Sequence, residues 1–148
     1  MFVVKITGFV AGSALALTFA TLSLAATSPQ QLIKVSLRGE ADSPMAIDVD
    51  STTAKAGLVQ FSVSNDAVGT DHEVVLVKLK DAHQKLEADP KTHKIDESTL
   101  QSMGEVSGLK PGAAGVLKVK LAPGKYVLLC NHKNHLELGM AKQITVVN

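Results

Sequence analysis

The chain carries a cysteine, a histidine and a methionine at even five-residue steps near its C-terminus: Cys130, His135 and Met140. Thiolate and thioether sulfurs are soft donors that favour copper(I), and imidazole nitrogen binds copper in both oxidation states. Cys130 is the only cysteine in the sequence, so it has no partner for a disulfide within the chain. His72, at the start of an apolar run upstream, could complete a set of two histidines and one cysteine. These residue types and this spacing predict a metal site with soft donors.

Each donor also has an ordinary alternative. Cys130 could be an inert buried thiol, Met140 could be a core residue, and His72 could end a strand without binding metal. Zinc could use the two histidines and the cysteine, although it gains little from a thioether. A cysteine near histidines could also be a nucleophile, but no helix N-terminus or separate orienting residue is evident to lower its pKa.

A third imidazole, His132, stands between Cys130 and His135. It could be a solvent-exposed loop side chain, or it could compete with His135 as a ligand. His83 and His93 lie in a polar stretch and are expected to be solvated.

The elements that must position these donors read as short β-strands. Apolar and polar residues alternate with period two between Gly, Pro, Asn and Asp, which is typical of strands with one buried face. The expected strands are 33–37, 46–49, 59–63, 73–79, 115–121, 126–130 and 143–147. Without long helices between them, they predict an antiparallel β-sandwich or barrel. The same period places Tyr126, Leu128 and Cys130 on one face of their strand, and Val127 and Leu129 on the other.

The stretch 80–111 is too long for a plain connection in a compact domain. A short helix over 82–87, capped by Asp81, could occupy its first part, and Asp96 or Ser98 could start another turn. We therefore expect a partly helical insertion over about 80–111.

The N-terminal segment predicts export. Lys5 precedes an apolar and small-residue stretch, 6–26, that contains no acid and no further base. Small residues near its end suit signal peptidase, which predicts a secretory signal peptide over 1–25, a single domain over 26–148, and a periplasmic or otherwise exported protein. Retention as a membrane anchor is the alternative, because a bilayer span needs about 20 residues.

The net charge of the chain bears on whether the protein binds nucleic acid. Removing Lys5 from the 15 basic residues leaves 14, which balance the 14 acidic residues. A neutral chain gives no support to nucleic-acid binding, which needs a concentrated basic surface.

Two blocks of this sequence resemble the cupredoxins, the small type 1 blue copper proteins. One block, 123–140, joins a Pro-Gly-Lys-Tyr turn to a Cys-x4-His-x4-Met string; the other, 56–79, contains His72. Together with the strand pattern, the two blocks cover most of the chain after the predicted signal.

The resemblance implies an all-β Greek-key sandwich of about seven or eight strands. It also implies one type 1 copper ion with His72, Cys130 and His135 as equatorial ligands and Met140 as the weak axial ligand. A backbone N–H from Glu73 is expected to donate to the sulfur, as in the family.

Two departures from the family pattern stand out. Many members have Pro-Gly before the loop histidine, where this chain has Lys133 and Asn134; Asn134 can adopt a positive φ, so a similar turn is expected. Glu73 stands where many members have Asn, which leaves open whether a side chain links the two ligand loops.

The function implied by the resemblance is transport of single electrons by Cu(II)/Cu(I) cycling. Such a carrier is not an enzyme, and we expect it to meet redox donor and acceptor proteins as a monomer. The alternative is a copper chaperone, storage or tolerance protein that uses the same ligands and serves a copper-delivery partner. A β-sandwich that keeps the motif without loading metal is a third possibility.

Overall fold

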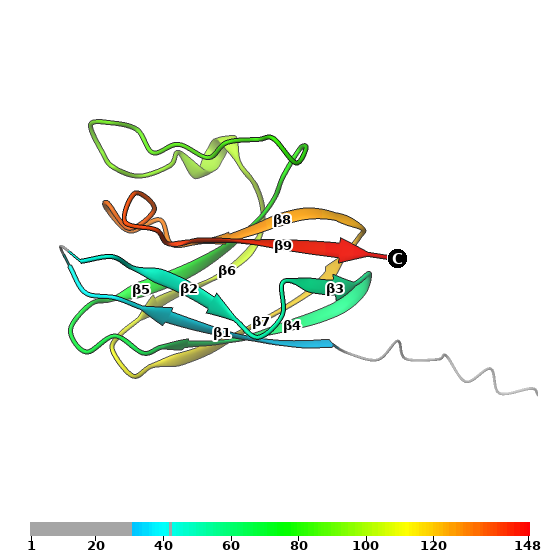
Figure 1. Ribbon diagram of the computed structural model, residues 1–148, viewed down its shortest axis with the longest axis horizontal. Coiled ribbons are helices and arrows are strands. Elements are labelled where there is room, and N and C mark those ends of the chain that lie inside the picture. The colour runs from blue at the N-terminus through cyan, green and yellow to red at the C-terminus, as the bar shows by residue number, and fades with distance from the viewer. Residues whose placement is uncertain (1–30, 42) are drawn as a thin grey trace, which may run out of the picture.

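The described part of the chain forms nine strands, arranged in two sheets that pack face to face, and one 3-10 turn (Figure 1). This computed structural model describes residues 31–41 and 43–148, so the predicted signal peptide, 1–25, lies outside the described residues. The strands are β1 Gln31–Arg38, β2 Ala46–Val49, β3 Thr53–Lys55, β4 Gly57–Asn65, β5 His72–Lys78, β6 Gln101–Leu109, β7 Ala114–Leu121, β8 Gly124–Leu129 and β9 Ala141–Val147. The predicted all-β sandwich is confirmed.

The two sheets are mixed, whereas the sequence analysis expected antiparallel pairing. Sheet A has the order β2-β1-β4-β7, and sheet B has the order β3-β9-β8-β5-β6. β1 pairs with β4, and β3 with β9, in parallel; the other pairs are antiparallel. After β2 the chain adds β3 to the edge of sheet B and returns to sheet A, so β4 runs in the same direction as β1.

Two strands, β3 and β6, were not predicted, and both lie at an edge of sheet B. β3 has only three residues, too few to show a period. β6 contains Gly104 and Gly108, and its pairing with β5 is interrupted by register shifts. Glycine and bulges weaken the alternation that identifies a strand.

The inner faces of the two sheets form the main core. Tyr126, Leu128 and Cys130 belong to this core, whereas Val127 and Leu129 belong to a second cluster on the outer face of sheet B. The predicted division of this strand between two faces is therefore confirmed.

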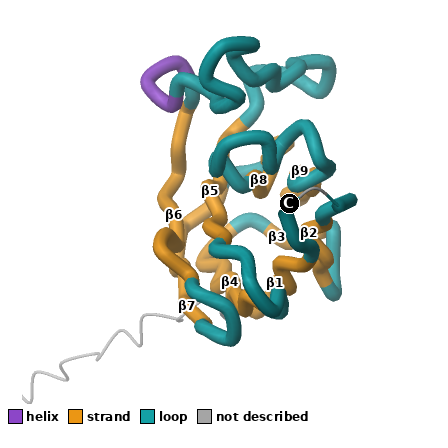
Figure 2. The backbone as a smooth tube through the Cα atoms, turned by 90° about the vertical axis from the view of Figure 1, so that its left-hand side faces the viewer, coloured by secondary structure: helices purple, strands orange, loops and turns teal. Residues whose placement is uncertain are grey.

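The covering segment, residues 79–100, packs on the outer face of sheet B and forms a third layer (Figures 1 and 2). Its buried residues Leu79 and Ile95 contact the second cluster, to which β5 contributes Val75 and Val77. β5 is thus buried on both faces, which explains why it reads as a nearly continuous apolar run.

The helix expected over 82–87 is absent: only a turn forms near Asp81, and 84–89 has no regular structure. Asp81 does accept the His83 N–H at 2.7 Å, but six residues are too few for a stable helix without tertiary support. The second expected turn forms as η1, Glu97–Thr99, with Asp96 as its N-cap. Among the described residues no helix is long and apolar enough to cross a membrane.

Candidate metal centre

Three buried side chains bring their donor atoms together at one end of the sandwich: His72, Cys130 and His135. Nδ1 of His72 and Sγ of Cys130 each lie 3.2 Å from Nδ1 of His135. All three donor atoms lie within 4.8 Å of one another. Donors bound to one ion at about 2.0 to 2.3 Å lie about 3.3 to 4 Å apart, so the two 3.2 Å separations are close to those in a site for a single ion.

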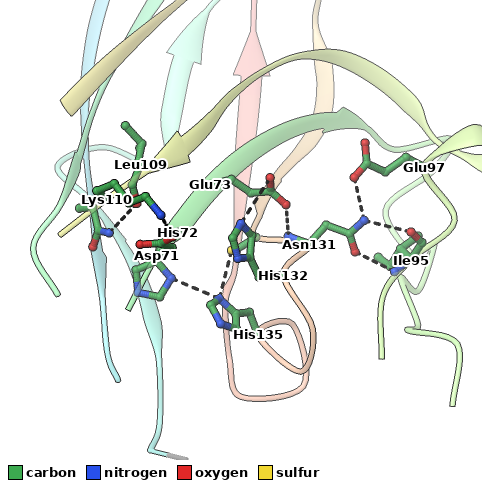
Figure 3. A network of polar contacts seen from close by, with 12 residues as sticks. Asp71, His72, Glu73, Ile95, Glu97, Leu109, Lys110, Asn131, His132 and His135 are labelled. Atoms are coloured by element: carbon green, nitrogen blue, oxygen red, sulfur yellow. Dashed lines mark hydrogen bonds and ion pairs between the residues drawn. The ribbon is translucent and has the colours of Figure 1, made fainter. Parts of the chain in front are cut away.

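Each donor comes from a different element. His72 is the first residue of β5 and pairs with Leu109 of β6. Cys130 directly follows β8, and its side chain is fully buried in the main core. His135 lies in the metal-binding loop, residues 131–139, and points toward His72 in Figure 3. Two donors are therefore fixed by neighbouring strands, and the third by the loop between β8 and β9.

The orientation of the His72 ring is set by a backbone carbonyl. Nε2 of His72 lies 3.2 Å from the carbonyl oxygen of Gly39, which can only accept a hydrogen bond. Nε2 therefore carries the proton, and the lone pair of Nδ1 is left free toward Cys130 and His135. A hydrogen bond of this kind commonly fixes the tautomer of a metal-binding histidine.

Burial keeps both imidazoles neutral at pH 7. Desolvation lowers the pKa of His72, and it lowers the pKa of His135 to about 4, with the nearby His72 and His132 acting in the same direction. A neutral imidazole is the form that binds a metal ion.

Burial also raises the pKa of the Cys130 thiol, to about 11. Hydrogen bonds from the backbone N–H groups of His132 and Glu73 act in the opposite direction but do not outweigh desolvation. The bond from Glu73 agrees with the expectation from the resemblance. A thiol with a raised pKa is a poor nucleophile, so the burial of Cys130 argues against the catalytic alternative.

Met140 directly follows the metal-binding loop and is fully buried in the main core with Cys130. Its N–H donates to the carbonyl of His135 at 3.0 Å, and its carbonyl accepts the N–H of Cys130 at 3.2 Å. These bonds close the loop around the donors. Axial ligation by the Met140 thioether remains a prediction.

The loop makes the tight turn at Asn134 that was predicted from the sequence. Asn134 has φ +69°, the positive value predicted for it, and its carbonyl accepts the N–H of Leu138 at 3.0 Å. His132 is partly exposed, and its ring centre lies 5.2 Å from that of His135. It does not belong to the group of converging donors, which favours the loop side-chain interpretation.

The side chain of Glu73, in β5, contacts the loop that follows β8. Whether a side chain makes this link was left open by the sequence. One carboxylate oxygen accepts the N–H of Asn131 at 3.2 Å, and the other lies 3.7 Å from Nε2 of His132. Figure 3 shows Glu73 directed toward both residues. A carboxylate therefore makes the side-chain connection between these two parts of the chain.

Glu40, which was not predicted from the sequence, joins the loop after β1 to the loop before β5. Its carboxylate accepts hydrogen bonds from Val68 N–H at 2.6 Å, Gly69 N–H at 3.1 Å and the Thr70 hydroxyl at 2.9 Å. These bonds, the one from Val68 first, lower the pKa of Glu40. Glu40 follows Gly39, so it holds the carbonyl that orients His72. No sequence signal marks it, because its partners lie 28 to 30 residues away.

Comparison with known proteins gives matches in structure only. No protein-family model matches the chain, and no curated protein does. An auracyanin from Roseiflexus castenholzii matches with a TM-score of 0.55 and 20% identity, over 82% of this chain and 99% of that one. Auracyanin A, a "blue" copper protein from Chloroflexus aurantiacus, matches with 0.56 and 18%, over 80% and 99%. Rusticyanin from Thiobacillus ferrooxidans matches with 0.57 and 16%, over 79% and 77%. At these identities the likeness establishes a shared fold.

Proposed function

We propose that this chain, which has the cupredoxin fold, is an exported carrier of single electrons that holds one type 1 copper ion. The ligands are His72, Cys130 and His135, with Met140 in the axial position. The proposal depends on one observation: two imidazole Nδ1 atoms and one sulfur are buried together. Nδ1 of His135 lies 3.2 Å from Nδ1 of His72 and 3.2 Å from Sγ of Cys130. Two histidines, one cysteine and a weak axial methionine are the donor set of electron-transfer copper sites.

Copper would supply the one-electron chemistry, and the protein would supply a fixed, dry set of donors. His72 and His135 are neutral at pH 7 and offer lone pairs without first losing a proton. The Cys130 thiol loses its proton when a cation binds, because a metal stabilises the thiolate that burial alone disfavours. The strands on either side hold these donors, so little rearrangement would accompany a change of charge.

Burial favours an electron carrier over a copper-delivery protein. His72 and Cys130 are fully buried and His135 is 8% exposed, so an incoming protein could not reach the donors without opening the loop. An electron can pass through the protein that covers the donors, whereas a copper ion could leave only if the loop opened. The proposed partners are accordingly a redox donor and a redox acceptor, and the protein is proposed to act as a monomer that transforms no substrate.

We also propose that residues 26–148 form one domain that follows a cleaved signal peptide, 1–25, and that the domain works in the periplasm or another exported compartment. The apolar stretch 6–26 supports export.

Repeated redox cycling in the presence of a Cu(I) chelator tests this function against copper delivery. A carrier keeps its copper through several rounds of reduction and reoxidation, so the protein-bound copper stays constant. A delivery protein loses copper to the chelator in the reduced state within the first rounds. Loss of most of the copper on a single reduction would contradict the carrier proposal.

A further inference from the structure

The covering segment is hydrogen-bonded to the metal-binding loop through Asn131, the residue after Cys130. Oδ1 of Asn131 accepts the N–H of Ile95 at 2.7 Å, and Nδ2 donates to the carbonyl of Ile95 at 3.0 Å. Nδ2 also donates to a carboxylate oxygen of Glu97 at 2.7 Å. Dashed lines in Figure 3 trace these three bonds. The Asn131 side chain thus pairs with Ile95 as a neighbouring strand would, satisfying both its N–H and its C=O.

A second contact lies further along the same loop. The N–H of Asn134 donates to the carbonyl of His93 at 3.1 Å, and Nδ1 of His93 lies 3.0 Å from a carboxylate oxygen of Glu137. His93 has φ +56°, a conformation that is uncommon for a residue with a side chain. The N–H of His93 is held by the carbonyl of Asp89 at 2.7 Å. The covering segment therefore grips the loop at both ends of the stretch that carries His135.

The part of the covering segment that contacts the loop is itself packed against sheet B. Ile95 is 8% exposed and packs in the second cluster with Val75 and Leu129, which belong to the strands that carry His72 and Cys130. Leu136, next to His135, packs against the same cluster. Asn131 itself is 3% exposed, so its hydrogen bonds are sheltered from water. Buried bonds of this kind are costly to break, since each leaves polar groups unpaired.

We propose that Asn131 is a positioning residue and that residues 93–97 form a clamp on the metal-binding loop, holding His135 in place before metal binds and in both oxidation states. The importance of the clamp for redox chemistry rests on the proposed function. The clamp itself consists of contacts between protein groups that are not proposed ligands, so it can be tested separately on the metal-free chain.

The clamp predicts how the loop should behave when Asn131 is replaced. Without Asn131 the loop keeps its own internal bonds, such as those from His135 N–H to His132 and from Leu138 N–H to Asn134. It loses the buried part of its attachment to the third layer and keeps only the contacts of Asn134 and Glu137 with His93, so it can move away from β5 and admit water to the donors. If Asn131 had a purely structural role, its replacement would lower the free energy of unfolding but would leave the loop closed below the melting temperature.

The test compares Asn131→Ala and Glu97→Ala with a control, Asp81→Ala, in the mature chain. The control removes a 2.7 Å hydrogen bond within the covering segment that does not reach the loop. Hydrogen exchange is measured on the metal-free proteins at the amides of Asn134 and Leu138, whose acceptors both substitutions leave in place. We expect exchange about tenfold faster or more in Asn131→Ala, a smaller change in Glu97→Ala, and none in the control.

The second part of the experiment measures the affinity for copper and the reduction potential. We expect Asn131→Ala to bind copper about 10 to 100-fold more weakly, as outer partners of metal ligands commonly cause, and to shift the reduction potential. A folded Asn131→Ala protein with unchanged loop exchange and unchanged affinity would overturn the clamp. If Asn131→Ala does not fold, Glu97→Ala decides, and unchanged loop exchange there overturns it. If the unaltered protein fails to bind copper, the proposed function fails alone, and the exchange arm still tests the clamp.

Discussion

Gly139 lies directly against the carbonyl oxygen of Met45: a Cβ added to Gly139 would stand 2.8 Å from that oxygen. The same stretch of backbone is held in place by the N–H of Met45, which donates to the carbonyl of Leu138 at 2.9 Å. Gly139 also has φ +111°, a conformation that residues with side chains rarely adopt. The residue before Met140 must therefore be glycine for both conformational and steric reasons.

Replacing this glycine should damage the loop that carries His135. We expect Gly139→Ala to lower the free energy of unfolding of the metal-free protein by about 1 to 3 kcal/mol or more, measured by urea denaturation. Gly57→Ala is the matched control, because Gly57 has φ +133° but no atom lies within 4 Å of its Cβ position. The control carries the strain without the clash, so equal losses in the two variants would contradict the close approach to Met45.

Glu40 should make stability depend on pH in a defined direction. Its pKa is lowered in the folded protein, first by the bond from Val68, so its contribution is complete above the pKa of the unfolded chain and is lost as pH falls through the lowered folded pKa. We expect Glu40→Gln to be less stable than the unaltered protein at pH 7. The difference should shrink when both are unfolded in urea at about pH 3. A difference that stays constant between the two pH values would argue against the carboxylate as its source.

Metal binding at neutral pH should release one proton, and Cys130 should be its source. The pKa of the thiol is raised to about 11, so the thiol is protonated at pH 7, whereas the pKa values of His72 and His135 are lowered, so both imidazoles have already lost their protons. Affinity should therefore rise about tenfold for each pH unit near neutrality. Calorimetric titration in two buffers of different ionisation enthalpy counts the protons. Release of none would show that Cys130 is not a ligand; release of two or more would show that a histidine is protonated before binding.

His132 should be dispensable for copper binding. Its ring lies beside His135 and near Glu73, outside the group of converging donors. We expect His132→Ala to keep the thiolate-to-copper visible band and His135→Ala to lose it. A lost or strongly shifted band in His132→Ala would identify His132 as a competing ligand.

The parts of the fold set by a local pattern could be predicted from the sequence. Alternation placed Cys130 and Leu128 on the core face of their strand, and the conformational freedom of asparagine gave the positive φ of Asn134. Donor chemistry selected His72 and His135 as companions of Cys130, and the three donor atoms lie within 4.8 Å of one another.

The contacts that hold the site together had no local signal. Gly39, Glu40 and Ile95 act through backbone groups or through partners far away in the sequence, and neither composition nor period marks such contacts. The prediction of a helix over 82–87 was wrong for a related reason: Leu86 packs against the second cluster, a tertiary contact that local propensity does not register.

Addition of Cu(II) to the purified, metal-free mature chain tests the central claim most directly. One equivalent should produce an intense thiolate-to-copper band in the visible spectrum that disappears on reduction and returns on reoxidation. Cys130→Ser should show no such band while remaining folded. Absence of the band from the unaltered protein, with the Cys130 thiol shown to be intact, would contradict the account.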